Sequence, residues 1–283
     1  MKEFYLQGKD LTGETGSKRG EIRFHWNITY SCNYRCRYCF FDGKWEEYGK
    51  RTVFLEPSGW EKNWRRIFEV YGSCFLVITG GEPFTYPGFI QIIRKVSAFH
   101  RINISTNGSG NMENFAGSVS PERVSLTFSF HPGFNTLKKI ISGIEFVREK
   151  GFKTDYINLC AYPPFIPKVE GYLEEAAGSG LKLKLIPFCG EFEGKRYPES
   201  YSDYEKEVLG MDGVWEDNVT RKGSLCCAGY RTALIFPDGK TARCGQIGEK
   251  HIIGDFFSDK FRLLEEPLPC EADICPCLEA PEA

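Results

Sequence analysis

The stretch "SCNYRCRYCF" at residues 31–40 places three cysteines within eight residues, in the spacing C-x3-C-x2-C. It follows directly after "IRFHWNITY" at 22–30, whose β-branched and aromatic residues predict a strand. Four thiolates close a structural metal site, whereas three leave an iron or zinc ion able to bind a further ligand. The stretch therefore predicts an open metal site, held by Cys32, Cys36 and Cys39, at the carboxyl end of a strand. Taken alone, the spacing fits a partial zinc site or buried thiols about as well.

The composition describes a chain that can bury a sizeable core and has no excess of basic charge. Of its 283 residues, 41% are hydrophobic, and the formal net charge is −2. This length suits one large domain with a small one, or two ordinary domains. The charge is unlike that of nucleic-acid-binding proteins. The N-terminus lacks the apolar run of a signal peptide, and apolar runs such as "CFLVI" at 74–78 are too short to cross a bilayer. We therefore expect a cytoplasmic protein that binds neither nucleic acid nor a membrane.

Twelve cysteines are many for this length, and most of them fall into two groups along the chain. In a secreted protein an even number of cysteines suggests disulfides. Without an export signal, close groups of cysteines favour metal binding instead. Arg35 and Arg37, which lie within the first group, are expected to help the neighbouring thiols ionise.

Strand-like and helix-like segments alternate between residues 22 and 187. The predicted strands are 22–30, 74–79, 101–106, 123–130, 154–161 and 182–188. The clearest helix is 135–150, with Asn135 as its predicted N-cap and Gly151 after its end. Strands that alternate with helices imply parallel βαβ units, and right-handed crossovers would close or nearly close them into a barrel. The predicted fold class is therefore α/β, with a partial (β/α)6 barrel as the core.

The C-terminal part of the chain has a different character. Residues 187–222 are polar and predict a loop with one short helix, whereas "RTALIFPDGKTARCG" at 231–245 predicts a β-hairpin around Asp238-Gly239. The last twenty residues contain Pro and Cys and show little periodicity. The expected organisation is an N-terminal extension (1–20), a barrel core (21–190), a linker (191–222) and a small cysteine-rich domain (223–283).

The three-cysteine motif, with aromatic Tyr38 directly before Cys39, resembles the signature of the radical S-adenosylmethionine (SAM) superfamily. The resemblance implies that the three thiolates hold three irons of a [4Fe-4S] cluster, and that the fourth iron binds the methionine part of SAM. It further implies that the reduced cluster cleaves SAM into methionine and a 5′-deoxyadenosyl radical, which abstracts a hydrogen atom from a substrate. A reducing partner such as flavodoxin or ferredoxin would supply the electron.

Three further segments, each at the end of a successive strand, resemble the SAM contacts of this superfamily. In "ITGGEPF" (78–84), Gly80 and Gly81 would let backbone approach a ligand closely, and Glu82 would accept the amino group of SAM. In "ISTNG" (104–108), Thr106 and Asn107 resemble the polar pair near the ribose or carboxylate. In "FSFHP" (128–132), Ser129 resembles another polar contact, with His131 close by. Each segment alone is as well explained by an ordinary turn or helix cap, and their order is the stronger signal.

The second cysteine group resembles the opening of a SPASM domain or of the shorter twitch domain, which hold auxiliary [4Fe-4S] clusters. The hairpin turn would bring Cys227 close to Cys244 in the pattern Gly239-x4-Cys244. Two of Cys270, Cys275 and Cys277 would complete the ligand set, and Cys226 would pack or stay unused. Because only six cysteines are present in this region, we expect one cluster. A structural four-thiolate zinc site is the alternative, since spacing does not separate zinc from iron–sulfur.

The reaction is less determined than the cofactor. Enzymes of this layout act on peptides, protein side chains or small molecules, and oxidation or cross-linking of such a substrate is the first choice. The segment before the first strand is short and shows no obvious peptide-recognition domain, which makes a leader-peptide-dependent enzyme a weaker expectation. Cys160 and Cys189, near the ends of the last two barrel strands, are candidate hydrogen-atom donors in a redox-neutral epimerase or mutase. A protein that binds or senses iron without catalysis is the remaining alternative, and Cys74 is expected in the core.

Overall fold

A curved sheet of nine strands forms the centre of the protein, for which the computed structural model describes residues 19–210, 222–245 and 247–272. The strand order is β12-β11-β10-β1-β2-β3-β4-β5-β6. The six predicted strands are all present, each within two residues of its predicted bounds: β1 (Arg23–Thr29), β2 (Phe75–Gly80), β3 (Arg101–Thr106), β4 (Val124–Phe130), β5 (Tyr156–Ala161) and β6 (Lys182–Pro187). Neighbours among these six run parallel, which confirms the α/β barrel-like core.

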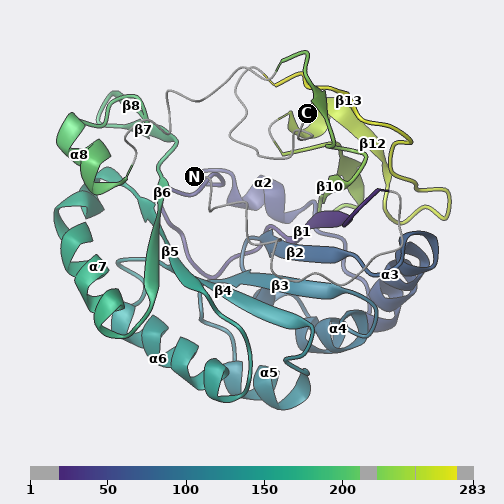
Figure 1. Ribbon diagram of the computed structural model, residues 1–283, viewed down its shortest axis with the longest axis horizontal. Coiled ribbons are helices and arrows are strands. Elements are labelled where there is room, and N and C mark those ends of the chain that lie inside the picture. Colours follow the sequence, from purple (N-terminus) through teal and green to yellow (C-terminus); the bar gives the residue numbers. More distant parts are fainter. Residues whose placement is uncertain (1–18, 211–221, 246, 273–283) are drawn as a thin grey trace.

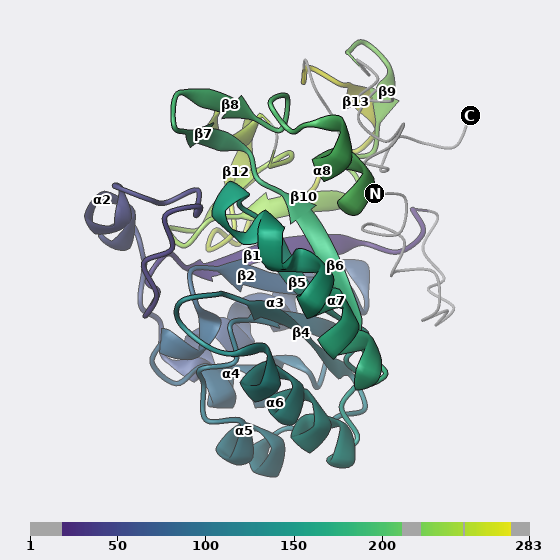
Figure 2. The same ribbon diagram turned by 90° about the vertical axis from the view of Figure 1, so that its left-hand side faces the viewer.

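Helices cover the convex side of this sheet (Figures 1 and 2). They are α3 (Pro57–Tyr71), α4 (Phe89–Val96), α5 (Met112–Ser118), α6 (Leu137–Glu149) and α7 (Val169–Gly178). The main core lies between the two layers. Trp64 of α3 packs its ring 5.0 Å from that of Trp26 on β1, and both side chains are fully buried. No helix among the described residues is long and apolar enough to cross a membrane.

The predicted N-cap of α6 was wrong by one residue. Thr136 caps the helix, since its side chain accepts a hydrogen bond from the Lys139 amide. The Asn135 side chain instead accepts a hydrogen bond from the His131 backbone amide and donates one to the Asn107 carbonyl. Asn135 therefore connects the ends of β3 and β4 rather than capping the helix.

The C-terminal hairpin is present as predicted, and it also joins the core sheet. Strands β10 (Thr232–Ile235) and β11 (Lys240–Ala242) pair antiparallel, and β12 (Ile252–Asp255) follows β11. Strand β10 pairs in parallel with β1, so the hairpin extends the sheet beyond its first strand. A separate two-stranded sheet joins β9 (Leu225–Cys226) to β13 (Leu268–Pro269). Figure 2 shows these C-terminal strands beyond β1, at the end of the molecule away from α4 and α5.

The segment predicted as loop contains a hairpin that the sequence did not indicate. Strands β7 (Gly190–Phe192) and β8 (Lys195–Tyr197) pair antiparallel before the short helix α8 (Asp203–Val208). The two residues between the strands, Glu193 and Gly194, both have positive φ, as a two-residue hairpin turn requires. Glutamate rarely adopts that conformation, so the turn carries no recognisable signal. The one short helix was predicted correctly.

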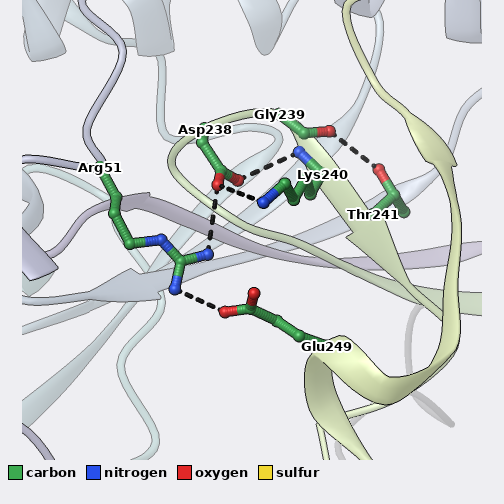
Figure 3. A network of polar contacts seen from close by, with 6 residues as sticks. All are labelled: Arg51, Asp238, Gly239, Lys240, Thr241 and Glu249. Carbon is green, nitrogen blue, oxygen red and sulfur yellow. Dashed lines mark hydrogen bonds and ion pairs between the residues drawn. The ribbon is translucent and has the colours of Figure 1, made fainter.

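Arg51 ties the C-terminal hairpin to the segment that follows the first cysteine group (Figure 3). It lies just beyond the short helix α2 (Trp45–Gly49) and forms ion pairs with Asp238 in the hairpin turn, at 3.2 Å, and with Glu249. The next segment adds a backbone bond from the Val53 amide to the Pro237 carbonyl, at 3.0 Å. The hairpin is therefore held by β1 and by the segment around Arg51 and Val53, which follows the cysteine group.

Replacing Arg51 should weaken this attachment. Arg51→Met leaves the half-buried Asp238 carboxylate without its guanidinium partner, and we expect a loss of about 1–3 kcal/mol in the free energy of unfolding. Urea unfolding measures the change. Lys50→Met is the matched control, because its ion pair with Glu46 is almost fully exposed and should contribute less than about 0.5 kcal/mol. Equal stability of the two variants would contradict the role given to Arg51.

Candidate active site at the strand ends

A cavity of about 250 Å3 opens where the carboxyl ends of the parallel strands meet. In a sheet of parallel strands these ends converge on one edge, where active sites of barrel-like folds are built. The cavity wall contains every site residue that the sequence predicted for the core: Cys32, Cys36, Tyr38, Cys39, Gly80, Gly81, Glu82, Thr106, Asn107, Ser129, Cys160 and Cys189. Further lining residues, among them Tyr34, Trp45, Ser105 and His131, were not assigned a role from the sequence.

The cysteine segment leaves β1 as a series of tight turns. The Cys39 amide donates to the Cys36 carbonyl at 3.1 Å, and the Tyr34 amide donates to the Cys32 sulfur at 3.3 Å. Cys36 is buried, and Cys32 and Cys39 are half-buried. Burial raises the pKa of all three thiols, that of Cys36 to about 11. Arg35 lowers the pKa of Cys32, in the direction expected from the sequence, but by less than burial raises it.

Gly80 and Gly81 are required by the close packing of β2 against the start of the cysteine segment. A Cβ atom on Gly80 would lie 2.2 Å from the Thr29 carbonyl oxygen, and one on Gly81 would lie 2.0 Å from that of Ser31. The Gly81 amide donates to Thr29, and the Glu82 amide donates to Ser31, at 2.7 and 2.9 Å. The glycines thus fix the cysteine segment against β2, which is a different reason from the ligand approach that the sequence suggested.

Glu82 places a buried carboxylate at the bottom of the cavity. Its side chain accepts hydrogen bonds from the Thr106 hydroxyl at 2.8 Å, the Asn107 amide at 2.7 Å and the Phe84 amide at 3.1 Å. Burial raises its pKa, and these three bonds act in the opposite direction. It forms no ion pair with any residue that the structure describes, although it is only 1% exposed. A carboxylate has about four lone-pair sites, so the three bonds leave room for a cationic ligand.

Thr106 and Asn107 are both occupied by bonds within the protein. Besides the Thr106 bond to Glu82, the Asn107 side chain donates to Asn33 at 3.0 Å and accepts from the Ser109 amide at 2.9 Å. Asn33 in turn donates to the Ser109 hydroxyl at 2.9 Å. This network binds the end of β3 to the cysteine segment. The sequence did not assign Asn33 or Ser109, since an isolated asparagine or serine carries no motif.

His131, at the end of β4, reaches into the cysteine segment. Its Nδ1 atom lies 2.9 Å from the Tyr38 hydroxyl and 3.5 Å from the Cys36 sulfur. The ring stacks on Tyr38 with an interplanar angle of 14°. Burial lowers the pKa of His131 to about 4, so the ring is neutral at physiological pH. The sequence placed His131 near the site without a role.

Cys160 and Cys189 line the cavity across from the first cysteine group. Burial raises the pKa of Cys160 to about 12 and also raises the pKa of Cys189. Both side chains are therefore protonated thiols near pH 7. Cys74 is fully buried in the core, as predicted.

Three of the described C-terminal cysteines pack in one place. Cys226 and Cys270 belong to one small group of buried side chains and Cys244 packs against it, whereas Cys227 is buried outside this group. Arg243, next to Cys244, donates to backbone carbonyls on both β13 residues and on Ala228, and so holds the strands of this group together. Cys275 and Cys277 lie outside the described residues. Within the described ranges, no three Cys, His or carboxylate side chains converge on a single metal ion.

A family model described as "Radical SAM superfamily" matches residues 26–168. The chain belongs to the radical SAM superfamily. This match spans the three cysteines and the ends of β1 to β5 that line the cavity, whereas the end of β6 lies beyond it.

The relatives agree with this assignment. A probable GTP 3′,8-cyclase of Methanopyrus kandleri is 25% identical over 85% of this chain and 86% of its own length. A GTP 3′,8-cyclase of Haemophilus ducreyi is 29% identical, but over only 47% of this chain and 42% of its own length. Streptococcus suis SuiB bound to S-adenosylmethionine has the same fold, with a TM-score of 0.60 and 13% identity over 84% of this chain and 63% of SuiB. The peptide-bound anSMEcpe structure has a TM-score of 0.59, at 17% identity over 84% and 78% of the two chains.

Substitution of Gly81 should separate the role of close packing from that of ligand contact. In Gly81→Ala the new methyl group meets the Ser31 carbonyl, and we expect a loss of about 1–3 kcal/mol in the free energy of unfolding, as for other overpacked sites. Thermal or urea unfolding of the protein without added SAM measures it. Gly171→Ala, in α7, has nothing within 4 Å of the new atom and should gain about 0.5–1 kcal/mol. Unchanged stability of Gly81→Ala would contradict the packing role.

Proposed function

We propose that Cys32, Cys36 and Cys39 hold the [4Fe-4S] cluster of this radical SAM enzyme and that the cavity beside them binds SAM and the reacting part of the substrate. The observation that carries the proposal is that one cavity joins three unbridged cysteines to the buried carboxylate of Glu82. These residues come from separate strand ends, and a structural role for each alone would not require them to share a cavity.

The described residues fit these groups chemically. Three thiolates would suit three irons of a cubane cluster and would leave the fourth iron open to a further ligand. The unpaired Glu82 carboxylate suits the amino group of SAM, because a buried charge is stabilised by an opposite one. Ser105 and Ser129 add hydroxyl groups to the wall.

Thr106 and Asn107 support the site by positioning. Their bonds hold Glu82 and Asn33, so we assign them the task of orienting the carboxylate and the cysteine segment. When bound, the reduced cluster and SAM supply a 5′-deoxyadenosyl radical that takes a hydrogen atom from the substrate. The aromatic wall of Tyr34, Tyr38, Phe40 and Trp45 would keep water from that reaction.

Oxidation or cross-linking of a peptide or small molecule remains the first choice of reaction, with an auxiliary cluster in the C-terminal segment. The described part of the cavity wall contains no Lys or Arg. Since polyanions are usually bound by such side chains, the wall gives no support for extending GTP, named as a substrate in the relatives, to this chain. Cys244, Cys270, Cys227, Cys275 and Cys277 were the candidate ligands from the sequence, and the buried group of side chains adds Cys226 to them.

A redox-neutral reaction is the second candidate, because two protonated thiols line the same cavity. A thiol at Cys160 or Cys189 would return a hydrogen atom to a substrate radical. Solvent deuterium in the product, lost in Cys160→Ala or Cys189→Ala, supports this reaction. A product without solvent deuterium, formed equally by both variants, supports oxidation.

The first test of the proposed function is SAM cleavage. With dithionite and SAM under anaerobic conditions, the purified protein should form 5′-deoxyadenosine, and Cys32→Ala should reduce its formation to background. Cys74→Ala, which removes a buried thiol far from the motif in sequence, is the matched control and should retain cleavage. Cleavage by Cys32→Ala at the normal rate would refute the assignment of the cluster.

Metal analysis tests the auxiliary site. Two clusters correspond to about eight iron atoms per chain, whereas about four iron atoms with one zinc would indicate a structural zinc site. Cys226→Ala and Cys227→Ala form a matched pair of neighbouring residues. Cys226 lies in the buried group of side chains that also contains Cys270. We therefore expect Cys226→Ala to remove about half of the iron and Cys227→Ala to remove less. A larger loss of iron in Cys227→Ala than in Cys226→Ala would favour Cys227 as the ligand, as the sequence predicted.

A further inference from the structure

Near the sulfur of Cys36 lie the polar atoms of Tyr38 and His131, to which the proposed mechanism gives no role. His131 Nδ1 is 3.5 Å from this sulfur and 2.9 Å from the Tyr38 hydroxyl. Tyr38 is also close enough to Cys36 to lower the pKa of its thiol. Three polar atoms from two separate segments, the cysteine turn and the end of β4, therefore meet at one of the three predicted cluster ligands.

The number of available protons limits how these atoms bond. A thiolate sulfur accepts hydrogen bonds but has none to donate. Tyrosine has one O–H group, and a neutral imidazole has one N–H group. If Nδ1 carries the proton, it donates to the Tyr38 oxygen or to the sulfur, and the Tyr38 O–H remains available for Cys36. If Nε2 carries the proton instead, the Tyr38 O–H can donate to Nδ1, so a donor at the sulfur requires the His131 proton on Nδ1 or the Tyr38 O–H directed at Cys36.

The two side chains are held in place by their neighbours. Tyr38 and His131 are stacked at an interplanar angle of 14°, and Phe165 packs its ring edge-on against Tyr38 with centroids 5.3 Å apart. The His131 backbone amide is bonded to the Asn135 side chain. A hydrogen bond between fixed groups needs no reorganisation when charge develops nearby.

We propose that Tyr38 and His131 form a hydrogen-bonded pair that donates to the Cys36 sulfur and raises the reduction potential of the cluster. This inference rests on the proposed cluster at Cys32, Cys36 and Cys39. Reduction adds negative charge that is shared with the cysteine sulfurs, and a donor at one sulfur stabilises the reduced form. The pair would thus make the cluster easier to reduce by a physiological donor. Both residues act through Cys36, so they are positioning residues.

The test is an anaerobic redox titration followed by electron paramagnetic resonance. The signal that changes on addition of SAM identifies the cluster of the first cysteine group and separates it from any auxiliary cluster. Tyr38→Phe and His131→Phe keep the aromatic rings and remove the polar atoms. We expect each to lower the ratio of reduced to oxidised cluster about threefold to tenfold at a fixed potential, where tenfold corresponds to about 59 mV for one electron.

Two further variants make the result specific. His131→Asn restores an amide N–H near the position of Nδ1 and should return the ratio toward that of the wild type. Tyr162→Phe removes a hydroxyl from a ring that packs 5.4 Å from Tyr38, and should leave the ratio unchanged. Iron content and circular dichroism confirm that each variant is loaded and folded.

The outcomes distinguish this inference from the proposed function. An unchanged potential in Tyr38→Phe and His131→Phe would overturn the inference, as would an equal shift in Tyr162→Phe. A wild-type protein with no SAM-sensitive cluster signal would instead overturn the proposed function. If His131→Phe loses the cluster, Tyr38→Phe and His131→Asn still decide the question, because one removes the donor and the other retains it.

Discussion

The contact between the Gly80-Gly81-Glu82 segment and the start of the cysteine turn is the constraint on which the site depends. Two backbone hydrogen bonds join these segments. The carbonyl oxygens of Thr29 and Ser31 lie so close to Gly80 and Gly81 that a Cβ atom would not fit there. The same segment then turns the Glu82 carboxylate inward to bind the end of β3. One short stretch of backbone thus sets the relative positions of the cysteines, the carboxylate and the next strand. A shift in any of them would displace the others, because cores and tight turns do not deform gradually.

Much of the core was predictable because parallel strands impose a simple geometry. Polar motifs after successive strands must gather at one edge of the sheet, so the order of the Cys36, Glu82, Asn107 and Ser129 segments was enough to place them in one cavity. The strand bounds followed from β-branched and aromatic runs, which the helices bury on one side. These predictions depend on local patterns that the tertiary structure does not override.

Other features depend on contacts between distant segments and had no local signal. The pairing of β10 with β1 joins residues more than 200 positions apart, and no periodicity within either strand specifies it. The hairpin at Glu193 relies on a conformation that glutamate rarely adopts. Cys226, and not its neighbour Cys227, belongs to the buried group that contains Cys270, and Cys226 lies in β9, which pairs with β13. In each case the deciding information is the partner, which lies elsewhere in the chain.

The hydrogen bonds around Glu82 determine how this carboxylate could meet a ligand in the cavity. The Thr106 hydroxyl and the Asn107 side chain already bond to Glu82, Asn33 or Ser109. Three of about four lone-pair sites on Glu82 are also in use. A cationic ligand would therefore meet one oriented carboxylate whose position is fixed from three sides. Such a preorganised charge in a buried site binds more strongly than a mobile one in water, because its desolvation and ordering have already occurred on folding. The polar residues after β3 thus fix the position of Glu82 through their own hydrogen bonds.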